Sequence, residues 1–465
     1  MRRGGRQRTR RSGLFAFVLV VAASLAVVSG LSAAQITSAK SGDARPVPKG
    51  ANLWIDVTGG ACVRSARKVA YNNARACSWA DANARCRGGD TVRVKGGDYG
   101  DVTIRGSNGR TSYCSVATLA REPVTARAVD LGIYQTCQSG PTSTSTTNWF
   151  KLTGPLKMAR FDADCSDHVY LDRVDVDISG APRRTCLGDS GRTYACTPQP
   201  FHVGAGNNPG DTASNFTLRN SKVHDALNPG AMMWLGTPGT NFLLDHNEIY
   251  NLINNTDGDI HDECVRLSDL SHVRFTRNHM WGCFVMDVFV TDGRLFNAVF
   301  ENNVFEAPTG SVGNSASAIL FARPPDTVTI RYNTFGSTGV TIPDPSTYPI
   351  GGGLTVVGNY FDTNPPCGAP NTRYAYNVTP RGVPNCGGPG ARSFNASALH
   401  AGFMRYFPYS GNGGASAQQR GDYRLRRGSP LVNRGNRTVY PPRDRTGAKR
   451  FRGRAPDVGA YESPY

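Results

Sequence analysis

The sequence predicts an all-β protein folded as a parallel β-helix, a solenoid in which short strands stack from coil to coil. Three observations support this prediction: a segment that recurs every 25 to 31 residues, a second strand pattern at a nearly constant distance before it, and a high content of turn-forming residues. Because a unit of this length cannot bury an apolar face alone, neighbouring units must stack against one another.

The composition of the 465-residue chain narrows the fold class. The chain contains 53 Gly and 29 Pro, and 39% of its residues are hydrophobic. This apolar fraction is too high for general disorder, and the glycine and proline content is too high for a helical bundle or a coiled coil. Frequent turns between short strands are therefore expected.

The first 34 residues have the features of an export signal. Six arginines and no acidic residue precede an apolar run over Leu14–Leu31, and Ser32-Ala33-Ala34 fits a cleavage site of small residues. We expect residues 1–34 to be a signal peptide, with the mature chain starting near Gln35. The alternative is an uncleaved membrane anchor, because the apolar run has about the minimum length for crossing a bilayer. Either way the protein is expected outside the cytoplasm, secreted or associated with the cell surface.

The twelve cysteines support this location. An even number of cysteines behind a signal peptide indicates disulfides formed in an oxidising compartment, and the absence of a CxxC pair disfavours a zinc ribbon. Cys264 with Cys283, and Cys367 with Cys386, are plausible partners because they are neighbours in the sequence. The connectivity as a whole stays open.

The repeat consists of alternating apolar residues, then Asn, any residue and a large apolar residue. Five segments share it: 241–249, 272–280, 297–305, 327–335 and 354–361. Their shared Asn residues are Asn247, Asn278, Asn303, Asn333 and Asn359. Two earlier, weaker members have Ser221 and Val174 at this position. Asn amides in an inward-bending turn can hydrogen bond to their counterparts above and below, so we expect an asparagine ladder.

A second strand pattern precedes each Asn segment. It occurs at 232–235, 264–267, 287–290 and 318–321, and its second position precedes the following Asn by 13 to 15 positions. Such a constant offset is expected for the coils of a helix. A β-propeller is the alternative, but its blades need about 40 residues and four strands each.

The two ends suggest caps. Residues 78–106 contain a short helical pattern, then Gly-Gly and alternating strands, which favours a helix covering the first coil. Together GGDTVRVKGGDYG (88–100), the NxF-type coils, SPLVNRG (429–435) and DVGAYE (457–462) resemble secreted bacterial right-handed parallel β-helix proteins of the pectate-lyase-like superfamily. The resemblance covers roughly residues 50–462.

The resemblance implies a domain organisation and a class of partner. It implies a right-handed β-helix over 35–419, including an N-terminal cap at about 50–110, and a basic C-terminal cap at 420–465. Many proteins of this superfamily are polysaccharide lyases or glycoside hydrolases, and many others have no assigned activity. None of the end motifs is catalytic, so the resemblance transfers no active-site residues.

The outward residues of stacked strands should form a flat face with coils about 4.8 Å apart, which suits an extended polymer. If the apolar residues of the second pattern point inward, one outward row is formed by Trp234, Arg266, Phe289 and Leu320, with His202 one coil earlier. The adjacent outward row would contain Cys264 and Asp287, and Arg323 follows the end of a strand. Candidate substrate-binding residues are therefore Trp234, Phe289, His202 and Arg323.

The most charged segment, 254–266, suggests where chemistry could occur. Its candidate catalytic residues, with Asp287 on the next coil, are Arg266, Asp262, Glu263 and His261. A lyase must neutralise a uronate carboxylate and remove a proton, whereas a hydrolase needs two carboxyl groups at a set separation. Asp257 and Asp259 are candidate ligands for Ca²⁺, the one cofactor that the sequence suggests. The alternative is that this segment is only a solvated loop.

These observations lead to two functional hypotheses. The first is a carbohydrate-active enzyme, a polysaccharide lyase or glycoside hydrolase acting along the outer coil face. The second is a non-catalytic cell-surface or extracellular protein that binds glycans through the same face. The expected partner is a polysaccharide or cell-wall glycan and not a nucleic acid, the chain is expected to act as a monomer, and any membrane contact would come through an uncleaved N-terminal segment.

The net charge of +17 says little about the coil face. Without the six arginines of the signal region the charge is +11, and residues 420–465 alone account for +8 of it. Residues 35–419 therefore carry only +3. This distribution is poor evidence that the coils bind an acidic polymer, and it weakens the uronate-lyase interpretation.

Overall fold

The computed structural model describes residues 50–465 apart from 107–108, 133–146, 198, 205–212, 257–258, 261, 292–294, 307, 309–316, 344–352, 370 and 408–419. The expected export signal therefore lies outside the described residues. None of the described helices combines the length and the apolar character that crossing a membrane would require.

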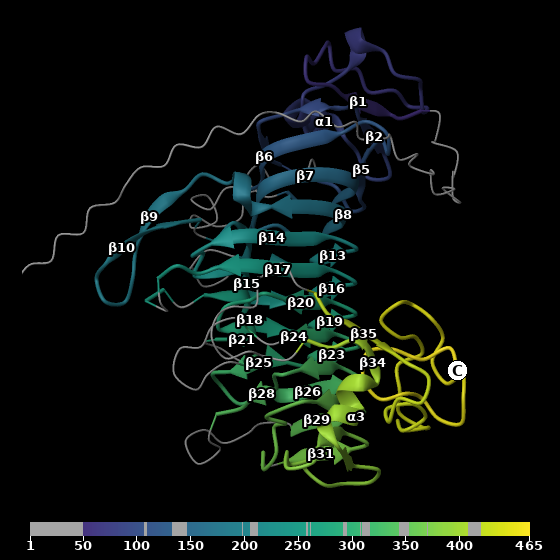
Figure 1. Ribbon diagram of the computed structural model, residues 1–465. Helices are drawn as coiled ribbons and strands as arrows, with labels where there is room; N and C mark the ends of the chain where they lie inside the picture. Colours follow the sequence, from purple (N-terminus) through teal and green to yellow (C-terminus); the bar gives the residue numbers. More distant parts are fainter. Residues whose placement is uncertain are drawn as a thin grey trace, which may run out of the picture. The chain divides into compact units, whose positions relative to one another are not determined.

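The chain forms the expected parallel β-helix. Strands in equivalent positions pair in parallel from one coil to the next, and they make three columns of strands along the stack (Figure 1). The first column comprises β1 (Leu53–Ile55), β2 (Thr91–Val94), β5 (Cys114–Thr118), β13 (Thr217–Arg219), β16 (Leu243–Asp245), β19 (Arg274–Thr276), β23 (Val299–Glu301), β26 (Asp326–Arg331), β29 (Gly353–Val357) and β31 (Thr372–Ala375).

The second and third columns follow the first around each coil. The second comprises β3 (Gly97–Asp98), β14 (Lys222–Leu227), β17 (Glu248–Ile253), β20 (His279–Trp281), β24 (Val304–Glu306), β27 (Thr334–Gly336), β30 (Tyr360–Phe361), β32 (Val378–Pro380) and β33 (Arg392–Phe394). The third comprises β4 (Asp101–Ile104), β11 (Phe201–Gly204), β15 (Ala231–Thr240), β18 (Glu263–Ser271), β21 (Met286–Val290), β25 (Ser317–Phe321) and β28 (Val340–Thr341).

Several strands do not belong to one column alone. β6 (Val124–Leu131), β7 (Phe150–Asp164) and β8 (Val169–Asp177) are long and run through a corner from one column into the next. Two short strands, β12 (Ala213–Ser214) and β22 (Leu295–Phe296), extend the pairing at coil corners. Among the described strands, two pairs are antiparallel: β9 (Arg184–Leu187) with β10 (Thr193–Cys196), and β34 (Phe403–Arg405) with β35 (Asp422–Leu425).

The core lies inside the stack and is built from the alternating apolar positions. Because successive side chains of a strand point to opposite faces, every second residue of each short strand enters the interior. In the first column these are Leu244, Phe275, Phe300, Ile330 and Val356, all fully buried and in register with one another. In the second column, the rings of Phe305, Phe335 and Phe361 stack on successive coils.

The expected asparagine ladder is present at the corner between the first and second columns. The backbone N–H of each ladder residue donates to the Oδ1 of the Asn on the next coil, over 2.8 to 3.0 Å from Asn247 to Asn359. Each Nδ2 donates to the same oxygen and to a carbonyl of the coil before. Ser221 occupies the expected place and accepts from the N–H of Val174. The ladder also includes Asn377, which the repeat search missed.

The residue before each ladder position has a left-handed backbone conformation. Its φ lies between 49° and 69° at Arg173, Asn220, His246, Arg277, Asn302, Tyr332, Gly358 and Tyr376. This conformation costs a non-glycine residue about 1–2 kcal/mol, and only one of the eight is glycine. The ladder hydrogen bonds are well placed to offset that cost, because they satisfy the backbone N–H groups that the sharp corner turns into the interior.

Helix α1 (Trp79–Arg85) covers the first coils, as expected. It begins at Ser78, whose Oγ accepts a hydrogen bond from the N–H of Asp81 and donates one to its carboxylate. The helix buries Trp79 and Ala82 and packs against β1 and β4. A second short helix, α3 (Ala396–Ala401), follows the last coil strand, and single 3₁₀ turns occur at Asn73–Arg75 and Ile178–Gly180.

The C-terminal segment runs along the flank of the stack and contacts several coils. The N–H of Gly421 donates to Glu306 of β24 at 2.9 Å, and Arg420 forms an ion pair with Glu248 of β17. Arg450 is fully buried and donates from Nη2 to the Oδ1 of Asn302 at 2.6 Å. The segment 420–465 thus contacts the side of the coils.

Disulfides join segments that are close in the sequence. The two pairs expected from spacing, Cys264–Cys283 and Cys367–Cys386, are both formed. Cys62–Cys77, Cys86–Cys114 and Cys186–Cys196 are also bonded; the last joins the two strands of the β9–β10 hairpin.

The ladder should make a large contribution to stability. Replacing Asn303 with Ala removes the acceptor of the Asn278 N–H inside the core, so we expect the free energy of unfolding to fall by about 2–4 kcal/mol in chemical denaturation. The control is Asn385→Ala, because the hydrogen bonds of Asn385 are open to solvent and their loss should cost less than about 1 kcal/mol. Equal effects of the two substitutions would contradict this assignment.

Candidate functional site

The third column presents one continuous row of outward side chains, which we call the outer row. Register places its members opposite one another on successive coils: Asp130, Asp162, His202, Trp234, Arg266, Phe289, Leu320 and Thr341. The positions expected from alternation, from His202 to Leu320, therefore lie in the predicted register. The functional roles of these residues remain predictions.

The most charged part of the outer row is a triad of Asp162, Asp164 and His202. Asp162 and Asp164 are successive outward residues at the end of β7, and His202 lies on β11, the next coil. Its Nδ1 is 3.3 Å from Oδ1 of Asp162 and 3.1 Å from Oδ1 of Asp164. Gly204 allows this arrangement, because a Cβ there would lie 2.7 Å from the Nε2 of His202.

The triad holds a protonated imidazole at neutral pH. Burial alone would lower the pKa of His202, but the hydrogen bond to Asp162 and the ion pair with Asp164 outweigh it and raise the pKa to about 9. Burial raises the pKa of Asp164, against the influence of His202. The side chain of His202 remains 17% exposed, so its charge can be reached from outside.

The three side chains could also bind a cation, because their ligand atoms lie within 4.8 Å of one another. Binding through Nδ1 would require His202 to lose the proton that it shares with the carboxylates. The contacts of Nδ1 with both acids are at hydrogen-bond distance, and this geometry fits a charge-paired imidazolium better than a metal ligand.

Arg266 occupies the middle of the outer row and is held from three sides. Its Nη2 and Nε donate to Oε1 of the buried Glu263 at 2.6 and 3.1 Å. Its guanidinium carbon lies 5.4 Å from the ring centre of Trp234 and 5.8 Å from that of Phe289, on the coils before and after. A cation held between two aromatic rings is a surface suited to stacking and to hydrogen bonding with a sugar or a carboxylate.

None of the candidate acids that the structure describes is a member of the outer row. Asp262 is buried and accepts from the N–H of Gly230 and the Nδ2 of Asn254, both at 2.6 Å, so its carboxylate stabilises a turn. The carboxylate of Asp259 accepts from the N–H and Oγ of Ser190 on the β9–β10 hairpin. Asp257 and His261 lie outside the described residues, and the calcium site expected there remains a prediction. Arg323 is exposed just after β25.

The expectation that Cys264 and Asp287 form a second outward row is wrong. Both are fully buried, and Cys264 is bonded to Cys283, which lies just after β20. Among the described residues, neither carboxylate oxygen of Asp287 has a hydrogen-bond partner. Burial and then the nearby Glu306 raise the pKa of Asp287 well above its usual range, which favours a neutral carboxyl.

The sequence analysis missed Asp162 and Asp164 and the role of His224. Asp162 and Asp164 alternate with the buried Phe161 and Ala163, but the coils before residue 168 lack the Asn of the repeat. His224 lies between Asp175 and Asp225, at 2.8 and 2.7 Å, and burial is outweighed by these hydrogen bonds, which raise its pKa.

The rings of the His224 cluster are largely covered, although its carboxylates are partly exposed. The rings of His224, Tyr250 and Trp281 stack on successive coils of the second column with centroid distances of 4.7 and 4.2 Å. His224 and Trp281 are buried, and the guanidinium of Arg420 from the C-terminal segment lies over Trp281. We therefore assign this stack a structural role and take the outer row as the candidate site.

Comparisons with known proteins leave the function open. No family model and no curated protein matches the sequence. A solved structure described as the crystal structure of pectate lyase Pel9A is similar, with a TM-score of 0.42 and 15% sequence identity, over 88% of this chain and 96% of that chain. A likeness of this size assigns no activity, so the function must be argued from this chain's own residues.

The charge of His202 can be tested directly. Asp164→Asn should lower the pKa of His202 from about 9 toward its ordinary value, because a neutral amide stabilises the imidazolium less. The measurement is an NMR titration of the imidazole signal, identified by its loss in His202→Gln. Asp259→Asn is the control, since Asp259 lies on the hairpin contact and should leave His202 unchanged. A wild-type His202 that titrates near 6.5 would contradict the triad.

Asp287 should make the fold less stable as pH rises. Its folded-state pKa lies well above the unfolded one, so raising the pH from about 4 toward neutrality favours the unfolded chain, where the carboxyl ionises freely. Asp287→Asn should therefore gain stability over the wild type across this range in chemical denaturation. Asp262→Asn is the matched control and should lose stability, because its carboxylate accepts two hydrogen bonds. A pH-independent effect of Asp287→Asn would contradict the prediction.

Proposed function

We propose that this protein is a secreted, carbohydrate-active member of the pectate-lyase-like superfamily that binds an extended polysaccharide along the outer row and cleaves it beside the His202 triad. The observation that carries the proposal is the succession of His202, Trp234, Arg266 and Phe289 on adjacent coils. These four coils span about 14 Å at the usual strand spacing, a length that suits several sugar units of an extended chain. The disulfides support export, because such bonds persist in oxidising compartments.

The residues of the row offer the interactions that a polysaccharide needs. Trp234 and Phe289 supply apolar ring faces on which sugars can stack, and Arg266 supplies donors for hydroxyl or carboxylate oxygens. Arg266 keeps a fixed orientation because Glu263 and the two rings hold it. Binding would therefore cost little side-chain entropy.

The triad supplies proton transfer. An imidazolium with a pKa of about 9 is protonated at neutral pH and can donate to the glycosidic oxygen as the bond breaks. In an elimination, the carboxylate of Asp162 would remove the proton beside the uronate carboxyl while His202 protonates the departing oxygen. In a retaining hydrolysis, Asp162 would attack the anomeric carbon, and neutral His202 would then take a proton from the water that releases the sugar. Their carboxylate oxygens lie within 4.8 Å of one another, which is too close for the 6.5–9.5 Å that an inverting hydrolase needs. Elimination and retaining hydrolysis are thus the two reactions that this geometry favours.

A non-catalytic glycan-binding role is the second candidate. It is favoured by one observation: the cations of the row are already paired, Arg266 with Glu263 and His202 with two carboxylates. Such a surface carries little free charge and would suit stacking on a neutral glycan. The two candidates differ in turnover but share the binding face.

Substitutions in the row should separate binding from chemistry. Trp234→Ala should weaken binding of the substrate polysaccharide roughly three- to tenfold through the lost stacking surface. His202→Gln should keep binding and lower turnover by about 10²–10⁴-fold. Arg173→Gln is the matched control, because Arg173 is an exposed cation away from the row. The assay uses polyuronates and neutral glycans, with ultraviolet absorbance for elimination products and reducing ends for hydrolysis.

The outcomes divide the hypotheses. Binding that depends on Trp234 without any turnover across the substrates would favour the non-catalytic role. Full activity of both Trp234→Ala and His202→Gln on a cleaved substrate would show that the outer row is not the site.

A further inference from the structure

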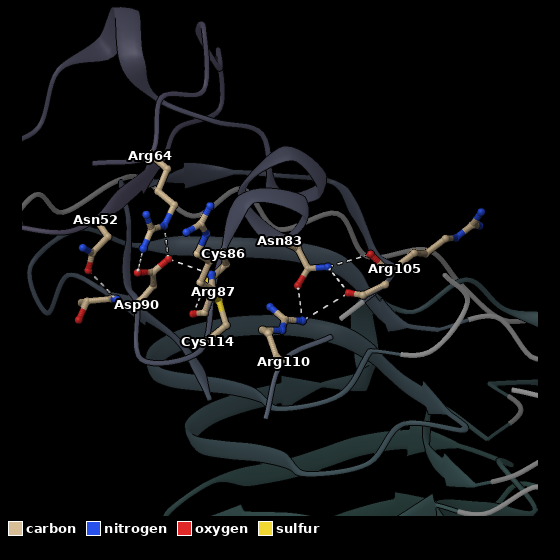
Figure 2. The surroundings of a disulfide bond; sticks show 11 residues. Asn52, Arg64, Asn83, Cys86, Arg87, Asp90, Arg105, Arg110 and Cys114 are labelled. Carbon is tan, nitrogen blue, oxygen red and sulfur yellow. Dashed lines mark hydrogen bonds and ion pairs between the residues drawn. A yellow bond between two sulfur atoms is a disulfide. The ribbon is translucent and has the colours of Figure 1, made fainter. Parts of the chain in front are cut away.

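A pocket of about 590 Å³ opens in the N-terminal cap, and its walls are unusually cationic. Four arginines line it: Arg64, Arg85, Arg87 and Arg110. The pocket lies where the end of α1 and the turn after it meet the segment 109–112, and the Cys86–Cys114 disulfide ties these two walls together (Figure 2). No residue of the outer row lines it.

Only one of the four arginines is neutralised by an ion pair with a described residue. Arg64 donates from Nε and Nη2 to both oxygens of Asp90, each at 2.7 Å (Figure 2). Asp90 also accepts from the backbone N–H of Arg87 at 2.8 Å. Within the described residues, the side chains of Arg85, Arg87 and Arg110 form no ion pair, so the pocket carries an excess positive charge.

Arg110 is the most buried of the four arginines. It is only 6% exposed, and its Nη2 donates to Oδ1 of Asn83 at 2.9 Å and to the carbonyl of Gly106 at 3.3 Å. Its Nε and Nη1 are buried and have no hydrogen-bond partner among the described residues. Burial lowers the pKa of Arg110 to about 10, which reflects the cost of a desolvated cation. Buried donors of this kind usually have an acceptor.

We propose that this pocket binds an oxyanion group, such as a carboxylate, sulfate or phosphate. A guanidinium presents its donors in a planar fork that matches such oxygens, and charge-assisted hydrogen bonds of this kind are the strong ones. Thr111 and Ser112 add hydroxyl donors to the same wall. The site is independent of the outer row and goes beyond the proposed activity.

The oxyanion can be free in solution or carried by an acidic polysaccharide. The shared chemistry is the same, because the pocket would contact only the charged group. A free anion diffuses into the pocket alone, whereas a polysaccharide must bring one of its own anionic groups to the cap. A competition experiment distinguishes these two sources.

The test is a calorimetric titration of the full chain with sodium sulfate at constant ionic strength, with sodium chloride as the blank. We expect saturable binding of sulfate that Arg87→Gln weakens at least about tenfold, since a charge-assisted hydrogen bond is lost. Arg110→Gln should abolish it. Because Arg110 is buried, circular dichroism must confirm that Arg110→Gln folds. If this variant does not fold, the test rests on Arg87→Gln, because Arg87 is exposed. Arg381→Gln, an exposed arginine elsewhere, is the matched control and should bind as the wild type does.

The competition uses a polyuronate and a neutral glycan of similar length. Displacement of sulfate by the polyuronate alone supports a polymer-borne anion, and sulfate binding without displacement supports a free one. Either result supports the site. Absence of saturable sulfate binding, or equal binding by the wild type and Arg87→Gln, would overturn it. Variants of the outer row should leave sulfate binding unchanged, so failure of this site and failure of the proposed activity can be distinguished.

Discussion

The whole structure depends on satisfying the backbone N–H groups that each coil corner turns into the interior. A buried, unpaired N–H is costly, and here every corner from Asn247 to Asn359 solves the problem with the same side chain. Because each Asn bonds to the next, the ladder aligns neighbouring coils without slippage. That alignment makes the outer row possible, since a shift of one residue would turn Trp234 and Arg266 into the core.

Much of the fold could be predicted because it is periodic. Alternation and a repeated Asn revealed the strands, the ladder and the register from His202 to Leu320. Asn377 was missed because its coil is short, only 18 residues after Asn359. The left-handed corners were not predictable from composition, because Arg277 and Tyr332 adopt a conformation that a sequence usually marks with glycine. Their cost is offset by neighbours, which local sequence does not display.

The candidate site was less predictable, because its charges come from positions where periodicity is lost. The 254–266 segment was predicted as the site because it contains many acids. The carboxylate of Asp262 instead stabilises a turn, and that of Asp259 contacts the β9–β10 hairpin. The alternation of its strand predicts an outward Asp287, yet its side chain is fully buried. The His202 triad, in contrast, combines the last residues of β7 with a strand 40 residues later. Only the stacking of those two coils shows that the three groups meet.

The C-terminal segment has a consequence for how the solenoid unfolds. Stacked repeats contact only their neighbours, so such a protein can lose coils one at a time from an exposed end. Here Arg420 is paired with Glu248, 172 residues earlier, and Arg450 with Asn302, 148 residues earlier. These contacts hold the C-terminal segment against several coils. The coils in the middle of the stack therefore cannot unfold one at a time while this segment stays bound. Residues 420–465 thus join a row of local units into one cooperative body.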